Sequence, residues 1–199
     1  MSDLQALLNQ LGGSNLSDLT RALGGVDESQ ARSALAMGLP AILAALQRNA
    51  ASPEGAQALD RALERDHDGS VLDNLGAVFS GARSADGEGI LRHALGDRRG
   101  AVEQAVSRQS ELDASQVSKL LAMVAPLVMG QLGRQRRSGG LDAGGLGDLL
   151  QRETQAVTRD APALGGLAGL LDRDGDGSIA DELGGIAKGI LGGMMKRDR

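Results

Sequence analysis

The sequence predicts an all-α protein, and its composition and patterning carry that prediction. The 199 residues include 30 glycines and one aromatic residue, Phe79, so the apolar content is nearly all Leu, Ala, Val, Ile and Met. Strands are enriched in aromatic and β-branched residues, and no sustained alternation of apolar and polar residues occurs along the chain. We therefore expect packed helices whose glycines and alanines let their backbones approach closely.

An internal duplication indicates a two-repeat helical bundle. Residues 27–48 align without gaps on residues 113–134, and Asp27 and Asp113 each stand at the N-cap position before a long apolar run. Pro40 and Pro126 coincide in the alignment. Because proline removes a backbone donor and clashes with the preceding turn, we expect each long helix to kink or break there.

Shorter signals complete the expected organisation. Ser52 followed by Pro53 is typical of a helix start, and Gly24-Gly25 is typical of the end of a helix that begins near Ser17. The predicted units are a first helical repeat at 1–80 with an acidic loop at 64–76, a connecting segment with a short helix at 81–100, and a second repeat at 101–199 with an acidic loop at 172–184.

The two acidic loops predict calcium ligands. Each places acidic side chains at alternate positions, then glycine, then serine and a β-branched residue, which resembles the start of an EF-hand loop. The predicted metal ligands are Asp172, Asp174, Asp176, Ser178 and Glu182 in the second loop, and Glu64, Asp66, Asp68 and Ser70 in the first. The second loop is the better match.

Both loops depart from the EF-hand pattern. The twelfth position of the second loop is Leu183 instead of the bidentate glutamate, so we expect weak affinity, on the order of 10⁻⁵ to 10⁻³ M. The alternative interpretation is structural. Ser70 with Asp73, and Ser178 with Asp181, also fit a capping box at the start of a helix.

Several segments together resemble a known family. The aligned Asp-x-Ser-Gln and Leu-Ala-Met-x-x-Pro runs, the segment 89–96 and the segment 66–70 are similar to the bacterial domain-of-unknown-function 937 family, which is related to YidB-like proteins. The resemblance covers roughly residues 19–185. It implies a bacterial, helical, uncharacterised protein, with a homeodomain-like arrangement in relatives, and it supplies no catalytic residues.

Other residues give weaker indications of chemistry. His67 is expected to be solvated, and His93 to lie on a helix face or be partly buried. Arg134, Arg136 and Arg137 form a basic tip that could contact phosphates, but the net charge of −5 favours a solvated helix end whose cations meet the helix dipole. The glycine-rich stretches lack the Gly-Lys-Ser/Thr ending of a phosphate loop.

The preferred functional prediction is a non-enzymatic structural or interaction module with weak calcium-binding loops. The alternatives are a DNA-associated helical protein and an enzyme that uses carboxylates of an interhelical cleft. Predicted partners are another protein or a second copy, through a helix at 183–195 that carries glycine every fourth residue. The charge argues against nucleic acid, and no apolar run approaches the ~20 residues of a membrane span. A cytoplasmic location is expected.

Overall fold

The computed structural model describes residues 3–13 and 15–160. These residues belong to a compact unit that extends from Met1 to Pro162, and the other unit, Ala163–Arg199, lies outside the described residues. Every regular element in the described part is helical, so the all-α prediction is confirmed. Within it no single helix is long and apolar enough to cross a membrane.

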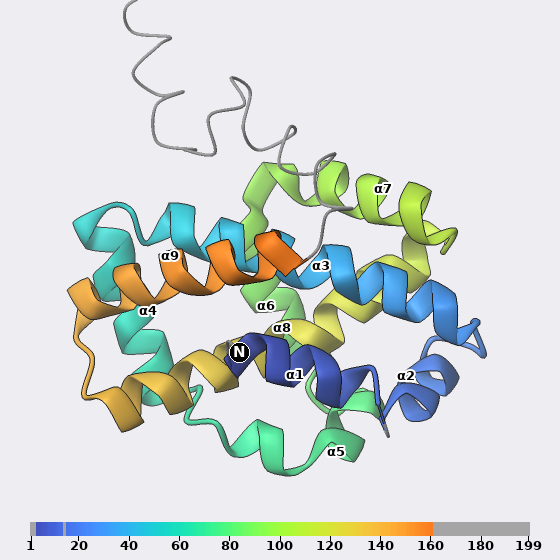
Figure 1. Cartoon of the computed structure of the whole chain (residues 1–199), viewed down its shortest axis with the longest axis horizontal. Coiled ribbons are helices and arrows are strands. Elements are labelled where there is room, and N and C mark those ends of the chain that lie inside the picture. The colour runs from blue at the N-terminus through green and yellow to red at the C-terminus, as the bar shows by residue number, and fades with distance from the viewer. Residues whose placement is uncertain (1–2, 14, 161–199) are drawn as a thin grey trace, which may run out of the picture. The chain divides into compact units, whose positions relative to one another are not determined.

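The helices follow one another with short connections (Figure 1). In chain order they are α1 Asp3–Leu11, α2 Leu16–Ala22, α3 Glu28–Asn49, α4 Pro53–Arg65, the 3₁₀ helix η1 Ser70–Asp73, α5 Leu75–Phe79, α6 Ser84–Leu95, the 3₁₀ helix η2 Gly96–Arg98, α7 Arg99–Ser110, α8 Ala114–Gly139 and α9 Ala143–Asp160. The compact unit therefore contains the predicted first repeat, the connecting segment and the start of the second repeat.

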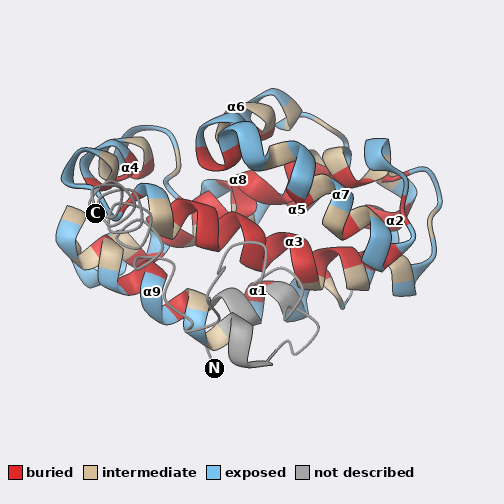
Figure 2. Ribbon diagram, turned by 90° about the horizontal axis from the view of Figure 1, so that it is seen from above, coloured by how far each residue is buried: buried red, intermediate tan, exposed pale blue. Residues whose placement is uncertain are grey.

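The core forms around the two long helices, α3 and α8. They contact each other, α6 packs against both, and α7 and α9 pack along α3. Figure 2 shows buried residues running through the middle of α3 and α8, with exposed residues on the surrounding helices. Residues 120–130 of α8 are all buried. This burial requires an apolar surface on nearly every side of the helix, which the Leu, Val, Met and Ala of this segment provide.

Both long helices begin as the sequence predicts. The side chain of Gln30 accepts a hydrogen bond from the Asp27 backbone N–H at 3.2 Å, and Gln116 accepts from the Asp113 N–H at 3.0 Å. Each helix therefore starts with a capping box, in which an N-cap residue and the third helical residue satisfy backbone donors.

Neither helix ends at its proline, so of the two expected outcomes, a kink or a break, the break does not occur. Pro40 lies inside α3 and Pro126 inside α8, and both prolines are buried among neighbouring helices. In an α-helix the Ala122 carbonyl would accept a hydrogen bond from the backbone N–H four residues later. That residue is Pro126, which has no N–H. Gly87 of α6 lies directly against that carbonyl, because a Cβ built on Gly87 would stand 1.8 Å from the oxygen. The surrounding packing thus holds α8 in helical form through the proline.

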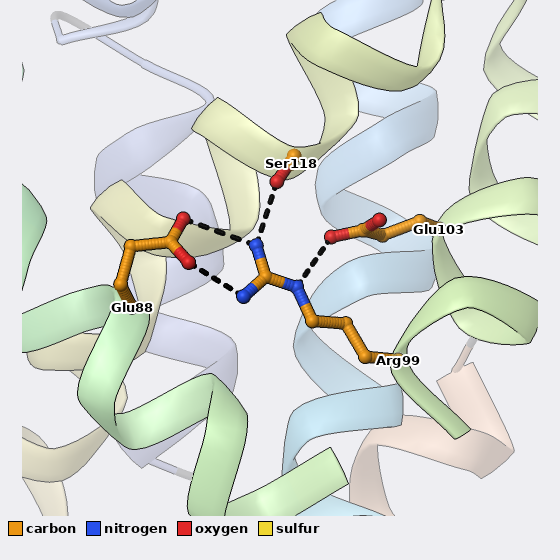
Figure 3. A network of polar contacts seen from close by, with 4 residues as sticks. All are labelled: Glu88, Arg99, Glu103 and Ser118. Carbon is orange, nitrogen blue, oxygen red and sulfur yellow. Dashed lines mark hydrogen bonds and ion pairs between the residues drawn. The ribbon is translucent and has the colours of Figure 1, made fainter. Parts of the chain in front are cut away.

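A polar network joins α6, α7 and α8 (Figure 3). Arg99 donates to both carboxylate oxygens of Glu88 on α6, through Nη1 at 2.5 Å and Nη2 at 3.0 Å. Its Nε donates to Glu103 on α7 at 2.7 Å, and Nη2 also donates to the Ser118 hydroxyl on α8 at 2.7 Å. The planar guanidinium can serve all three partners because its donors are fixed in a fork.

Candidate functional site

A cleft of about 780 Å³ lies between α4 and α6. Leu46 of α3 and Met129 of α8, both buried, contribute from the two central helices. Small and apolar side chains of α4 and α6 form much of the remaining lining, and charged or imidazole groups complete it. The remaining lining residues are Asn49, Gly55, Ala58, Leu59, Ala62, Arg65, Asp66, His67, Arg83, Asp86, Gly89, Ile90, His93 and Ala94.

Asn49, the last residue of α3, fixes one end of this cleft. Its Nδ2 donates to the carbonyl oxygens of His93 at 2.9 Å and Ala94 at 3.2 Å, which satisfies two acceptors in the last turn of α6. The Asn49 carbonyl lies against Gly55 of α4, where a Cβ would stand only 1.8 Å away. Asn49 therefore connects the end of α3 to both helices that enclose the cleft.

The start of α4 is encoded locally. The Ser52 hydroxyl accepts a hydrogen bond from the Gly55 N–H at 3.1 Å, and Pro53 occupies the first turn. This confirms the helix start that the sequence predicts from Ser52 and Pro53. Because Gly55, Ala58 and Ala62 recur at intervals of three and four residues, they share the α4 face that lines the cleft.

Two ion pairs lie among the polar lining residues. Arg65 donates to Asp66, with Nη2 and Oδ2 2.7 Å apart, and this hydrogen bond lowers the pKa of Asp66 from its ordinary value. Arg83 pairs with Asp86 at 3.4 Å. Burial lowers the pKa of His67 and outweighs the opposite effects of Asp66 and Asp86. Near neutral pH the cleft therefore presents an ionised Asp66 beside an uncharged His67.

One histidine differs from its predicted environment, and the other lies on a helix face as predicted. His67 is half-buried instead of solvated, and His93 is an exposed residue of α6. Both line the same cleft although 26 positions separate them in the chain. The sequence signals for this cleft are the small residues of α4 and Gly89 on α6, which leave space between the two helices.

The first acidic loop lies on α8. A Cβ on Gly133 of α8 would stand 1.8 Å from the His67 carbonyl oxygen, and a Cβ on Gly130 would stand 2.4 Å from the Val71 side chain. Gly69 adopts φ +89°, a left-handed conformation that favours glycine. The loop thus approaches α8 closely at two glycines of that helix.

The predicted ligands of the first loop have protein partners. Asp66 binds Arg65, Asp68 accepts a hydrogen bond from the Ser70 N–H at 2.9 Å, and Glu64 lies 3.7 Å from the Arg136 guanidinium. Within the described residues, no group of three or more His, Cys, Asp or Glu side chains could hold a metal ion. The predicted ligands Asp172, Asp174, Asp176, Ser178 and Glu182, and the glycine-faced segment 183–195, lie outside the described residues.

The local helix start near Ser70 also differs from the prediction. Gly69, not Ser70, precedes the 3₁₀ helix η1 as its N-cap, and Asp68 caps the turn by accepting from the Ser70 N–H. The next α-helix, α5, begins after Asn74, whose side chain accepts a hydrogen bond from the Ala77 N–H at 3.2 Å. Instead of the predicted Ser70–Asp73 capping box, the Asp68 side chain accepts at the start of η1 and the Asn74 side chain accepts at the start of α5.

Two arginines of the predicted basic tip are bound by carboxylates. Arg134 donates to Asp73 at 2.9 Å and to the Gly69 carbonyl at 3.1 Å. Arg136 is paired with Asp60 of α4. The predicted solvated helix end is wrong for Arg136, which is largely shielded and paired with α4, whereas Arg134 and Arg137 are exposed and the acidic loop gives Arg134 a counter-charge.

Comparison with known proteins identifies one family. Its model, described as a bacterial protein of unknown function (DUF937), matches residues 5–135 of the chain. This range includes α3, α6, α7 and most of α8, and every lining residue of the cleft. Searches of curated proteins and of solved structures found no significant match.

Proposed function

The chain belongs to the bacterial protein family of unknown function DUF937, whose description assigns no activity, and we propose a function from the geometry of the cleft itself. The protein is a non-enzymatic helical binding module. Its α4–α6 cleft takes a ligand with an apolar body and a polar group that hydrogen-bonds His67 or His93.

The composition of the cleft is the observation that carries this proposal. Its volume of about 780 Å³ falls within the range of roughly 300–1,000 Å³ that is typical of ligand pockets. Leu46, Leu59, Ile90 and Met129 offer apolar contact, and the two imidazoles offer hydrogen bonds. Such a combination of an apolar lining with a few polar groups is typical of sites that hold and orient one molecule.

The state of the carboxylates supports binding over catalysis. Asp66 is hydrogen-bonded by Arg65 and its pKa is lowered, whereas a general acid works best with a pKa near the operating pH. Asp86 is likewise paired with Arg83. Both acidic groups that line the cleft therefore serve as counter-ions for arginines.

The order of the helices supports a two-repeat organisation. Two short helices, one long helix and one intermediate helix occur as α1–α4 and again as α6–α9. The long helix of each set starts with an aspartate and a glutamine in a capping box and has a proline inside. In this proposal the cleft lies where the last helix of the first set faces the first helix of the second set.

The test fills the cleft with a side chain. Gly89 lines the cleft, and a Cβ built there meets no atom within 4 Å, so Gly89→Leu adds bulk without displacing the backbone. Gly100→Leu on α7 is the matched control, because its Cβ is equally unobstructed and it lies outside the cleft. Both substitutions replace a helical glycine and should stabilise their helices by up to about 1 kcal/mol.

The binding probe is octanoate, which has an apolar chain and no ring. The protein has two histidines, and both line the cleft, so their ring signals in an NMR spectrum report on this site alone. We expect octanoate to shift both signals saturably in the wild type and in Gly100→Leu, and to have no effect in Gly89→Leu. Unchanged histidine signals in the wild type, or equal binding by Gly89→Leu, would refute the proposal.

A further inference from the structure

Arg48, near the end of α3, carries a charge that no carboxylate of residues 3–13 and 15–160 pairs with. Its side chain is half-buried, and its Nη1 atom is buried without a hydrogen-bond partner in the part of the chain that the structure describes. No ion pair involves Arg48 within residues 3–13 and 15–160. An unpaired cation that loses water contacts is destabilising, so this arrangement calls for an anion.

A second arginine increases the positive charge around Arg48. Burial first, and then the nearby charge of Arg98 in η2, lower the pKa of Arg48. Arg98 itself is exposed and makes no ion pair within the described residues. By contrast, Arg99 and Arg136, which are also largely shielded from solvent, each contact two carboxylates. Arg48 is therefore an exception among the shielded arginines of this structure.

The second repeat indicates which kind of anion fits. Arg48 aligns with Arg134 in the gap-free match of residues 27–48 to 113–134. Arg134 donates to the Asp73 carboxylate at 2.9 Å and to the Gly69 carbonyl at 3.1 Å, both in the acidic loop. An arginine at this position of the long helix thus binds an aspartate and a backbone oxygen of an acidic segment.

We infer that Arg48, with Arg98, binds a carboxylate of an acidic polypeptide segment supplied by a partner molecule. The carboxylate bridges the two guanidinium groups and supplies the counter-charge that Arg48 lacks within the described residues. This contact surface is distinct from the α4–α6 cleft, whose lining includes neither arginine. A carboxylate is favoured over a phosphate because the aligned Arg134 pairs with the Asp73 carboxylate of the acidic loop.

The test uses a peptide with the sequence of residues 66–76, the segment that Arg134 contacts. It is titrated into the full-length ¹⁵N-labelled protein while the side-chain Nε–H signals of the arginines are followed by NMR. A second peptide, in which the aspartate equivalent to Asp73 is asparagine, controls for the carboxylate. Arg48→Gln removes the central guanidinium, and Arg61→Gln, an exposed arginine of α4, is the matched control.

We expect the peptide to shift the Arg48 and Arg98 signals saturably, and Arg48→Gln to weaken binding about tenfold or more, as the loss of a charged hydrogen bond requires. Arg61→Gln and the wild type should bind alike, and the asparagine peptide should bind less. Binding that is unchanged in Arg48→Gln overturns the inference. So does a response to inorganic phosphate with none to the peptide.

Light scattering distinguishes two sources of the segment. A mass that doubles in the wild type and returns to that of one chain in Arg48→Gln identifies a second copy as the partner. Identical single-chain masses in both, together with peptide binding, identify a different protein.

Discussion

The backbone of Gly87 in α6 lies against the carbonyl of Ala122 in α8, the acceptor that Pro126 deprives of its helical donor. A Cβ at Gly87 would stand 1.8 Å from that oxygen and 2.6 Å from the carbonyl carbon. In this position the glycine Cα–H groups can make a weak hydrogen bond to the oxygen, worth about 0.5–1 kcal/mol. The contact explains how two helices can pack so closely beside a buried proline.

The first prediction concerns this contact. Gly87→Ala should lower the free energy of unfolding by about 1–3 kcal/mol, because the added methyl forces α6 away from α8. Gly89→Ala, two residues away on the same helix, should instead raise it by about 0.5–1 kcal/mol, since its Cβ meets nothing within 4 Å. Urea denaturation followed by circular dichroism measures both. Equal effects of the two substitutions would contradict the close approach of Gly87.

A second prediction concerns the Arg99 network. Arg99→Gln should destabilise the protein by about 1–3 kcal/mol, because it removes charged hydrogen bonds to Glu88 and Glu103. Arg99→Lys should rescue little of this, since an ammonium cannot reproduce the fork. Arg21→Gln removes an exposed pair with Asp18 and should cost about 1 kcal/mol or less. If denaturant midpoints of the Arg99 and Arg21 variants coincide, the network has no special role.

A third prediction follows from the lowered pKa of His67. The ordinary histidine pKa is 6.5, and burial lowers the pKa of His67 in the folded protein. As the pH falls below the ordinary value, the unfolded chain therefore binds more protons than the folded protein does. Stability supplied by neutral His67 is therefore fully present above pH 6.5 and is lost progressively below it. In His67→Gln the dependence of unfolding free energy on pH between about 7.5 and 5 should flatten.

His93→Gln is the control for that measurement, because His93 is exposed and lines the same cleft. It should retain the dependence seen in the wild type. A steeper loss of stability in His67→Gln than in the wild type would reverse the sign and exclude burial as the cause.

A fourth prediction tests calcium at the second acidic loop. The alternating Asp172, Asp174 and Asp176 predict weak binding, so calorimetric titration with calcium should give a heat signal in the wild type that Asp174→Ala removes. Asp68→Ala should leave the signal unchanged, because Asp68 already accepts a hydrogen bond from Ser70. Indistinguishable isotherms for the wild type and Asp174→Ala would dispose of the site.

Local features of this fold could be predicted because they depend on neighbouring residues. The caps at Asp27, Asp113 and Ser52 use side chains within three positions of the groups they satisfy. The single aromatic residue and the lack of apolar–polar alternation argued against a sheet, and these signals too are read from neighbouring residues. Each of these signals can be recognised in a window shorter than one helix.

The features that the sequence did not indicate depend on contacts between distant segments. Pro126 does not break α8, since Gly87 and the surrounding helices support the chain there. The carboxylates Asp60 and Asp73 pair with Arg136 and Arg134, which lie 76 and 61 positions away. The spacing of the acidic loop is equally compatible with an ion and with arginine partners, and only the fold brings those partners to it.

Three of the contacts that place α4, α6 and the loop involve main-chain atoms, at Gly55, Gly87 and Gly133. Main-chain atoms are common to every amino acid, so the separation of α4 and α6 does not depend on which side chains line the space between them. Leu59, Ile90 and the other lining residues can therefore change over evolution while the width of the cleft is preserved. Under the proposed binding role, a single scaffold of this kind can acquire new ligand preferences without refolding.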